Sequence, residues 1–220
     1  AWFAGVPLYY FYFPLPAVLA AALDLALPFE VAVKLMSVTG LLLTPPAAWV
    51  LVRGLGMRGW AAGLVATGAG LFVFHESHVH LGGTAASTLA GEFAYGLGFP
   101  LALAYLGVVA AAARGGRAHP TLAALLLAAC ALSHLVTAVA AVAGSLPLLA
   151  RRPARRTVLF SWGAGFLVSA PWSVPFLARQ PAMPDVPWTE SVGLLDVLPP
   201  ELWPLLPAAV GGAWLAWSAT

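Results

Sequence analysis

Apolar residues in this chain run in long stretches, and the short segments between them hold nearly all of the charge. A helix of roughly 20 apolar residues is long enough to cross a hydrocarbon layer about 30 Å thick. The pattern therefore predicts an all-α fold, a polytopic transmembrane helical bundle with interfacial and re-entrant helices. The stretches without Asp, Glu, Lys or Arg are 35–52, 60–74, 93–113, 120–150 and 157–178, followed by a weaker one at 202–217.

Composition agrees with a lipid environment. Of 220 residues, 61% are hydrophobic and 8% are charged, whereas a soluble domain has about 25% charged residues. The lone Cys130 excludes a disulfide within one chain. Because the basic residues lie in short loops, we interpret them as topology signals and expect the lipid bilayer as partner and no nucleic acid.

Arginines mark three of the predicted turns. The positive-inside rule places such turns on the cytoplasmic side, so we expect a multi-pass protein of the cell (inner or plasma) membrane. Both ends of 120–150 then face the cytoplasm, which requires an even number of crossings. We expect a hairpin of two short helices, or a re-entrant pair, that turns near Ser133-His134. The arginines are Arg53 and Arg58, then Arg114 and Arg117, then Arg151, Arg152, Arg155 and Arg156.

We expect one transmembrane domain over 1–220, and an internal fragment, because the chain opens at Ala1 without Met and ends in an apolar segment. Within it, 1–28 forms an outer juxtamembrane loop and short helix, and 29–178 the membrane helices. An outer loop at 179–202 precedes the start of a further helix at 203–220. Small residues are expected to allow close helix packing at Gly63, Gly68, Gly70, Gly163 and Gly165.

Four polar residues gather in the loop after 60–74, which the topology places outside. Imidazole and carboxylate groups at short spacing can bind Zn²⁺ or Mn²⁺, although the chain has no HExxH pattern. The alternative is a polar loop whose histidines lie in headgroup water. The four residues are His75, Glu76, His78 and His80.

Two further residues are candidates because of where the pattern places them. His134 lies between apolar helices, and an ionisable residue there is a functional hypothesis; the alternative is a neutral histidine bonded to a backbone carbonyl at the turn. Arg179 follows the stretch 157–178 at its outer end. Its guanidinium suits a lipid phosphate, and the alternative is an interface anchor.

Several segments together resemble the GT-C superfamily of polyprenyl-phosphate-sugar-dependent glycosyltransferases. The resemblance is nearest to the bacterial membrane proteins of the 6-pyruvoyl-tetrahydropterin-synthase-related family. It rests on the aromatic and proline-rich segments 2–7 and 13–16, the helix end 51–56, the outer-loop sequence Gly91-Glu92-Phe93-Ala94-Tyr95 and the hairpin sequence Leu132-Ser133-His134-Leu135.

The resemblance implies an enzyme that transfers a sugar from a polyprenyl-phosphate-linked donor at the outer membrane face. Glu92 matches the family's outer-loop acid, and we expect Glu92 and His134 to be catalytic. We expect Arg179, Tyr9 and Tyr12 at the substrate, and a divalent cation (Mg²⁺, Mn²⁺ or Zn²⁺) is a candidate cofactor. The family's first catalytic acid would lie upstream of Ala1. Where the family has paired acids, this chain has the histidine-containing loop instead.

Two other functions remain open: a transporter or channel component, and a noncatalytic assembly subunit. A kinking Pro45-Pro46 pair and glycine-rich helices are compatible with the discontinuous helices of transporters. Convergence of Glu92, His134 and the segment 2–13 on one outer cavity would favour transfer chemistry. A polar track between the two sides of the membrane would favour transport.

Overall fold

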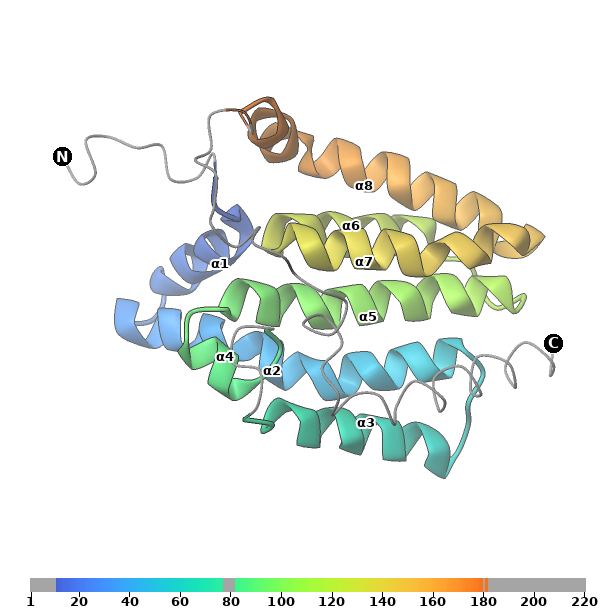
Figure 1. The fold of residues 1–220 in the computed structure, drawn as a ribbon, viewed down its shortest axis with the longest axis horizontal. Coiled ribbons are helices and arrows are strands. Elements are labelled where there is room, and N and C mark those ends of the chain that lie inside the picture. The colour runs from blue at the N-terminus through green and yellow to red at the C-terminus, as the bar shows by residue number, and fades with distance from the viewer. Residues whose placement is uncertain (1–10, 77–81, 180, 182–220) are drawn as a thin grey trace. The chain divides into compact units, whose positions relative to one another are not determined.

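The computed structural model describes residues 11–76, 82–179 and 181, and within them every regular element is helical. The all-α prediction is therefore confirmed. The chain divides into two units, Ala1–Ala178 and Arg179–Thr220. The first unit contains all of the described helices (Figure 1).

Three helices are long and apolar enough to cross a membrane: α2 (Phe29–Gly54), α5 (Phe93–Ala113) and α8 (Arg152–Ala178). At about 1.5 Å per residue, the shortest of them, α5, already matches the thickness of the hydrocarbon layer. The shorter α1 (Pro14–Asp24) and α3 (Trp60–Val73) are also apolar. These lengths and compositions indicate a membrane protein.

The predicted hairpin is present between α5 and α8. Helix α6 (Pro120–Ser133) ends and α7 (Leu135–Ser145) begins at His134, whose backbone is extended with φ −163° and ψ 121°. A 3-10 helix, η4 (Leu146–Ala150), then leads to α8. Helices α6 and α7 contact each other and overlap in Figure 1, so the turn at Ser133-His134 is confirmed.

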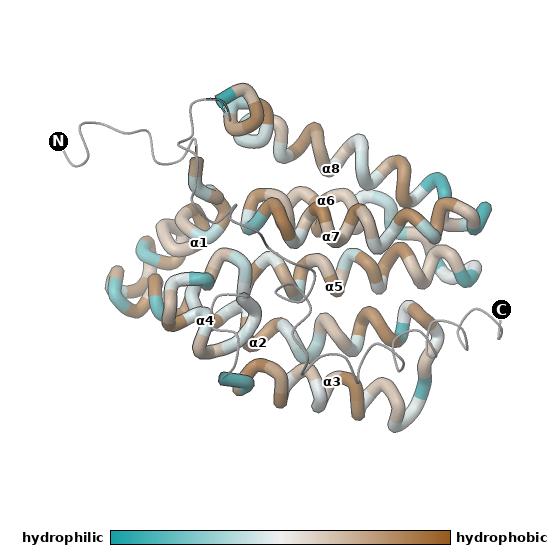
Figure 2. The backbone as a smooth tube through the Cα atoms, in the orientation of Figure 1, coloured by the Kyte–Doolittle hydropathy of each residue, from teal (hydrophilic) through white to brown (hydrophobic). Residues whose placement is uncertain are grey.

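The described arginines before Arg179 gather at one end of the helices, which we call the arginine end. There α2 ends, α3 and α6 begin, and α8 starts. A Cβ on Gly56 would meet the guanidinium of Arg114, and Arg53 and Arg117 line one hollow. The opposite end, which holds the His134 turn, is called the histidine end. Figure 2 shows hydrophilic residues mainly at these two ends, with apolar residues between them.

Helices α2 and α5 form an extensive interface through glycine. A Cβ on Gly107 would lie 2.7 Å from the carbonyl oxygen of Val50, and one on Gly40 would overlap the carbonyl group of Gly96. The predicted small-residue faces are thus largely wrong. Of the five predicted glycines, Gly63, Gly68 and Gly163 have no described neighbour within 4 Å of an added Cβ, and Gly70 would meet only Pro45, at 3.7 Å. Gly165 alone of the five is closely packed, against α6.

Two elements differ from the sequence predictions. Helix α8 begins at Arg152, earlier than the predicted 157, because Pro153 is its second residue and proline is tolerated in the first helical turn. A short helix, α4 (Ala85–Leu89), lies in the segment expected to be loop. It begins with a capping box in which the Thr84 and Ser87 side chains bond to each other's backbone N–H groups.

Candidate functional site

Glu92 is positioned by the junction between α4 and α5. Its backbone N–H donates to the Ser87 carbonyl at 2.9 Å, and its own carbonyl accepts from the Gly96 N–H at 2.9 Å. Gly91, at φ 112°, provides the turn, which is a conformation that residues with a Cβ rarely adopt. The half-buried Glu92 is the N-cap residue of α5, where the helix dipole stabilises a negative charge.

Tyr12 lies close enough to Glu92 for the two side chains to interact electrostatically. Burial and, to a lesser degree, the negative charge of Glu92 raise the pKa of the Tyr12 hydroxyl above its ordinary value of 10.0. The side chain is 37% exposed. The Tyr12 hydroxyl therefore keeps its proton at neutral pH and can act as a hydrogen-bond donor.

His134 packs in a group of rings from four elements, which we call the aromatic cluster. Its imidazole centroid lies 4.6 Å from that of Phe13 and 5.1 Å from that of Tyr95. The ring centroid of Phe13 lies 5.5 Å from that of Trp172, and the Trp172 and Phe176 rings are stacked with centroids 5.0 Å apart. The cluster thus joins the start of α1, the first turn of α5, the α6–α7 turn and the last turns of α8.

The backbone of the α6–α7 turn holds His134 in place. Its carbonyl accepts the Thr137 hydroxyl at 2.7 Å and the Ala138 N–H at 3.2 Å, which begins α7. The imidazole Nδ1 is buried and has no hydrogen-bond partner among the residues that the structure describes. A buried nitrogen of this kind is costly to leave unsatisfied.

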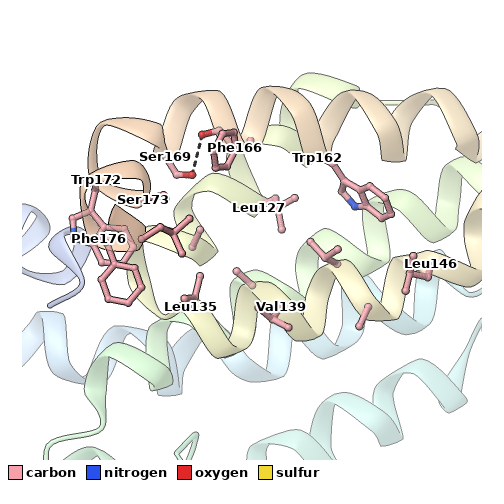
Figure 3. Close-up of a pocket in the computed structure, with 16 residues that line it drawn as sticks. Leu127, Leu135, Val139, Leu146, Trp162, Phe166, Ser169, Trp172, Ser173 and Phe176 are labelled. Atoms are coloured by element: carbon pink, nitrogen blue, oxygen red, sulfur yellow. Dashed lines mark hydrogen bonds between the residues drawn. The ribbon is translucent and has the colours of Figure 1, made fainter. Parts of the chain in front are cut away.

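An apolar groove begins at the aromatic cluster. It has a volume of about 460 Å³ and lies between the α6–α7 hairpin and α8, within the range of about 300–1,000 Å³ that is usual for ligand sites. Figure 3 shows Trp172 and Phe176 at one end and Trp162 and Leu146 at the other. Because Trp172 and Phe176 belong to both features, the groove and the cluster are continuous.

Only some of the predicted site residues lie together in the structure. Glu92, Tyr12 and His134 lie at the histidine end, in contact with or adjacent to the aromatic cluster. Arg179 is exposed and directly follows the last residue of α8, at the start of the second unit. Tyr9 lies outside the described residues.

The predicted metal site remains a prediction. His75 and Glu76 are exposed just after α3, whereas His78 and His80 lie outside the described residues. Within the described part of the chain, no three His, Cys, Asp or Glu side chains come together as metal ligands would. A site with the predicted ligands would therefore depend on His78 and His80.

Sequence reasoning missed the aromatic partners of His134. Trp172 and Phe176 are four residues apart and so share a face of α8, and Tyr95 lies three residues after Glu92 on α5. Gly82, at φ 79°, allows the Tyr95 ring to lie against the backbone where a Cβ would collide with it. The helical spacing was visible in the sequence, but the contact with His134 was not.

The fold defines the class of protein: an all-α protein with three helices able to cross a membrane, and with polar and aromatic side chains gathered at one end. No family model, curated protein or solved structure matches the chain.

Proposed function

We propose that the protein is a membrane glycosyltransferase that transfers a sugar from a polyprenyl-phosphate donor at the histidine end. One observation carries this proposal. The Tyr12–Glu92 pair, the His134 ring and the mouth of the apolar groove converge at the same end of the helices. A lipid-linked sugar needs this combination of a polar site and an adjoining path for a hydrocarbon chain.

The groove supports the lipid part of the proposal. Inside a bilayer a hydrocarbon chain gains little by moving from lipid to an apolar protein surface, because both environments are apolar. The groove therefore adds little to the binding free energy of the lipid donor. Its main effect is to orient the hydrocarbon chain so that the polar head of the donor lies at the aromatic cluster. Affinity has to come from groups that contact the phosphate and sugar.

The polar side chains supply the groups that transfer requires. A carboxylate within hydrogen-bond reach of the acceptor hydroxyl removes its proton, and Glu92 has this role. His134 has an Nδ1 with no partner among the described residues, which would accept or donate a hydrogen bond to the sugar donor or the acceptor. Arg179 opens the second unit, and its guanidinium chemistry keeps it a predicted phosphate-binding residue. A divalent cation, if bound by the predicted loop ligands, would add further positive charge at the leaving phosphate.

The arginine distribution supports an orientation. Eight arginines lie in the segments at the arginine end, and the positive-inside rule assigns such an end to the cytoplasm. The histidine end would then face the outside of the cell membrane. This is also the side on which the acidic residues of the first unit lie: Asp24, Glu30, Glu76 and Glu92.

The test is sugar transfer from radiolabelled polyprenyl-phosphate sugars by the purified full-length protein and its Glu92→Gln variant. Loss of a general base lowers the rate by about 10²–10⁴-fold, and we expect a loss of this size. Glu30→Gln is the matched control, because Glu30 is an exposed glutamate in the first turn of α2. Equal rates for wild type and Glu92→Gln would remove Glu92 from the chemistry.

A further inference from the structure

A second hollow lies at the arginine end, away from the aromatic cluster. It has a volume of about 260 Å³ and lies between the last turns of α2, the last turns of α5 and the start of α6. Its charged and aromatic lining consists of Trp49, Arg53, Arg117 and His119. None of these residues has a role in the proposed transfer reaction.

Two glycines in the lining of the hollow, Gly54 and Gly107, belong to the contact between α2 and α5. A Cβ on either would collide with the backbone of the other helix or lie within 3.0 Å of it. The helices therefore approach without intervening side chains. The larger Trp49 and Arg53 form a wall, in which the Arg53 guanidinium lies 5.7 Å from the centroid of the Trp49 ring.

The hollow is strongly electropositive. Its lining contains two arginines and a histidine but no carboxylate. The Arg53 guanidinium donates a long, 3.4 Å hydrogen bond to the Met57 carbonyl. His119 is the N-cap residue of α6, where free backbone N–H groups favour an anion. Arginine in particular suits a phosphate, because its guanidinium donates two parallel hydrogen bonds.

We propose that this hollow binds the phosphate of an anionic phospholipid headgroup. Arg53 and Arg117 donate to the phosphate oxygens, and the ring of Trp49, which is 47% exposed, lies at the level where headgroup and acyl chain meet. Basic pockets between membrane helices on the cytoplasmic side are suited to such headgroups. The lipid would bridge α2, α5 and α6 at the arginine end. This proposal requires membrane insertion but not transferase activity.

The test is native mass spectrometry of the full-length protein in neutral detergent, titrated with short-chain phosphatidylglycerol, short-chain phosphatidylcholine or inorganic phosphate. We expect phosphatidylglycerol to bind at least tenfold more tightly than either of the others. Inorganic phosphate that binds as tightly as phosphatidylglycerol would overturn the lipid assignment, because it would identify a site for free phosphate.

Matched variants distinguish lipid binding in this hollow from attraction of the lipid by surface charge in general. The Arg53→Gln/Arg117→Gln double variant should bind phosphatidylglycerol about tenfold or more weakly. The Arg58→Gln/Arg156→Gln double variant loses the same charge at the same end outside the hollow, and should bind within about twofold of wild type. Equal losses in both would contradict the proposal.

A further double variant, Arg53→Lys/Arg117→Lys, guards against misfolding. It keeps both positive charges but loses the paired guanidinium hydrogen bonds, so it should remain folded and bind phosphatidylglycerol more tightly than the Gln variant does. If the folded Lys variant bound phosphatidylglycerol no more tightly than the Gln variant, positive charge in the hollow would not determine binding. That result would overturn the proposal.

Discussion

At the level of single residues, Tyr12, Glu92 and His134 have different roles in the candidate site. Glu92 sits at the start of α5, where the helix dipole stabilises its charge. Tyr12 supplies a hydroxyl that stays protonated beside that charge. His134 is held by its own backbone while its ring packs against aromatic neighbours. A negative acceptor, a neutral donor and an imidazole nitrogen are thus brought together at one end of the protein.

The first prediction concerns the titration of Tyr12. Because burial and the Glu92 charge raise its pKa above 10.0, the neutral hydroxyl should persist as pH rises past 10. Glu92→Gln removes the charge and should lower the midpoint, although burial will still hold it above 10. The measurement is the absorbance of tyrosinate against pH, with the Tyr12→Phe curve subtracted to isolate one of five tyrosines.

The sign of the stability effect follows from the same shift. A tyrosine whose pKa is raised by folding stabilises the protein fully below the unfolded pKa, and this contribution is lost as pH rises through the folded value. A Tyr12 midpoint that did not respond to Glu92→Gln would show that the two side chains are not neighbours.

At the level of helices, the packing relies on small residues and a few buried hydroxyl groups. Tyr105 is fully buried on α5, and its hydroxyl lies 3.3 Å from the Ser145 hydroxyl and 3.2 Å from that of Ser161. The Trp162 indole N–H donates to Tyr105 and Ser145, at 3.1 Å each. Such interhelical bonds contribute about 0.6 kcal/mol each in membranes, and here they connect α5, α7 and α8 beneath the groove.

The second prediction tests the glycine contact between α2 and α5. Gly40→Ala places a Cβ against the Gly96 carbonyl and 2.6 Å from the Leu97 nitrogen, so it should destabilise the protein by about 1–3 kcal/mol. Gly63→Ala is the control, because among the described residues nothing lies within 4 Å of that Cβ. Alanine is the better helix former by up to about 1 kcal/mol, so the control should be neutral or stabilising.

Thermal unfolding in one detergent is the measurement for both glycine variants. If Gly40→Ala unfolded at the same temperature as Gly63→Ala, the close approach of α2 and α5 would be contradicted.

The helices were largely predictable from the sequence, because uncharged stretches and the arginine-rich turns mark where they begin and end. The limits of α5 agree with the prediction at both ends, and the hairpin turns at His134 as expected. The short α4 was missed because its capping box ends in Ser87 instead of the usual Glu or Gln. The packing glycines were misidentified because a glycine-rich sequence does not show which face of a helix meets another helix.

At the level of the whole molecule, the candidate site is assembled from segments that are far apart in the chain. Phe13, Tyr95, His134 and Trp172 belong to four different elements. The sequence pattern identified Glu92 and His134 as polar residues in an apolar chain. It did not show which aromatic rings surround them. The groove was also not predictable, because its lining is as apolar as the rest of the helices.

The third prediction tests the groove as a path for the lipid chain. Ala143 lines the groove three residues before Leu146, and Leu146 lies at the end remote from the aromatic cluster (Figure 3). Ala143→Trp therefore places a large ring toward that end. It should raise KM for long-chain polyprenyl donors by about tenfold, equivalent to about 1.4 kcal/mol, and leave short-chain donors unaffected. Ala140→Trp is the control, because Ala140 is exposed on the same helix outside the groove.

Steady-state transfer with donors of two chain lengths distinguishes these outcomes. Equal effects of the two tryptophans, or an Ala143→Trp effect that did not depend on chain length, would exclude the groove from donor binding.

The central claim is that the histidine end transfers sugar from a lipid-linked donor at the outer membrane face. The most direct measurement is transfer of radiolabelled sugar in sealed, right-side-out vesicles that contain the full-length protein, with a membrane-impermeant acceptor mixture supplied outside. The account predicts labelled product without permeabilisation. Transfer that appears only after the vesicles are opened would contradict the outer-face assignment, and no transfer from any polyprenyl-phosphate donor, opened or sealed, would contradict the glycosyltransferase function.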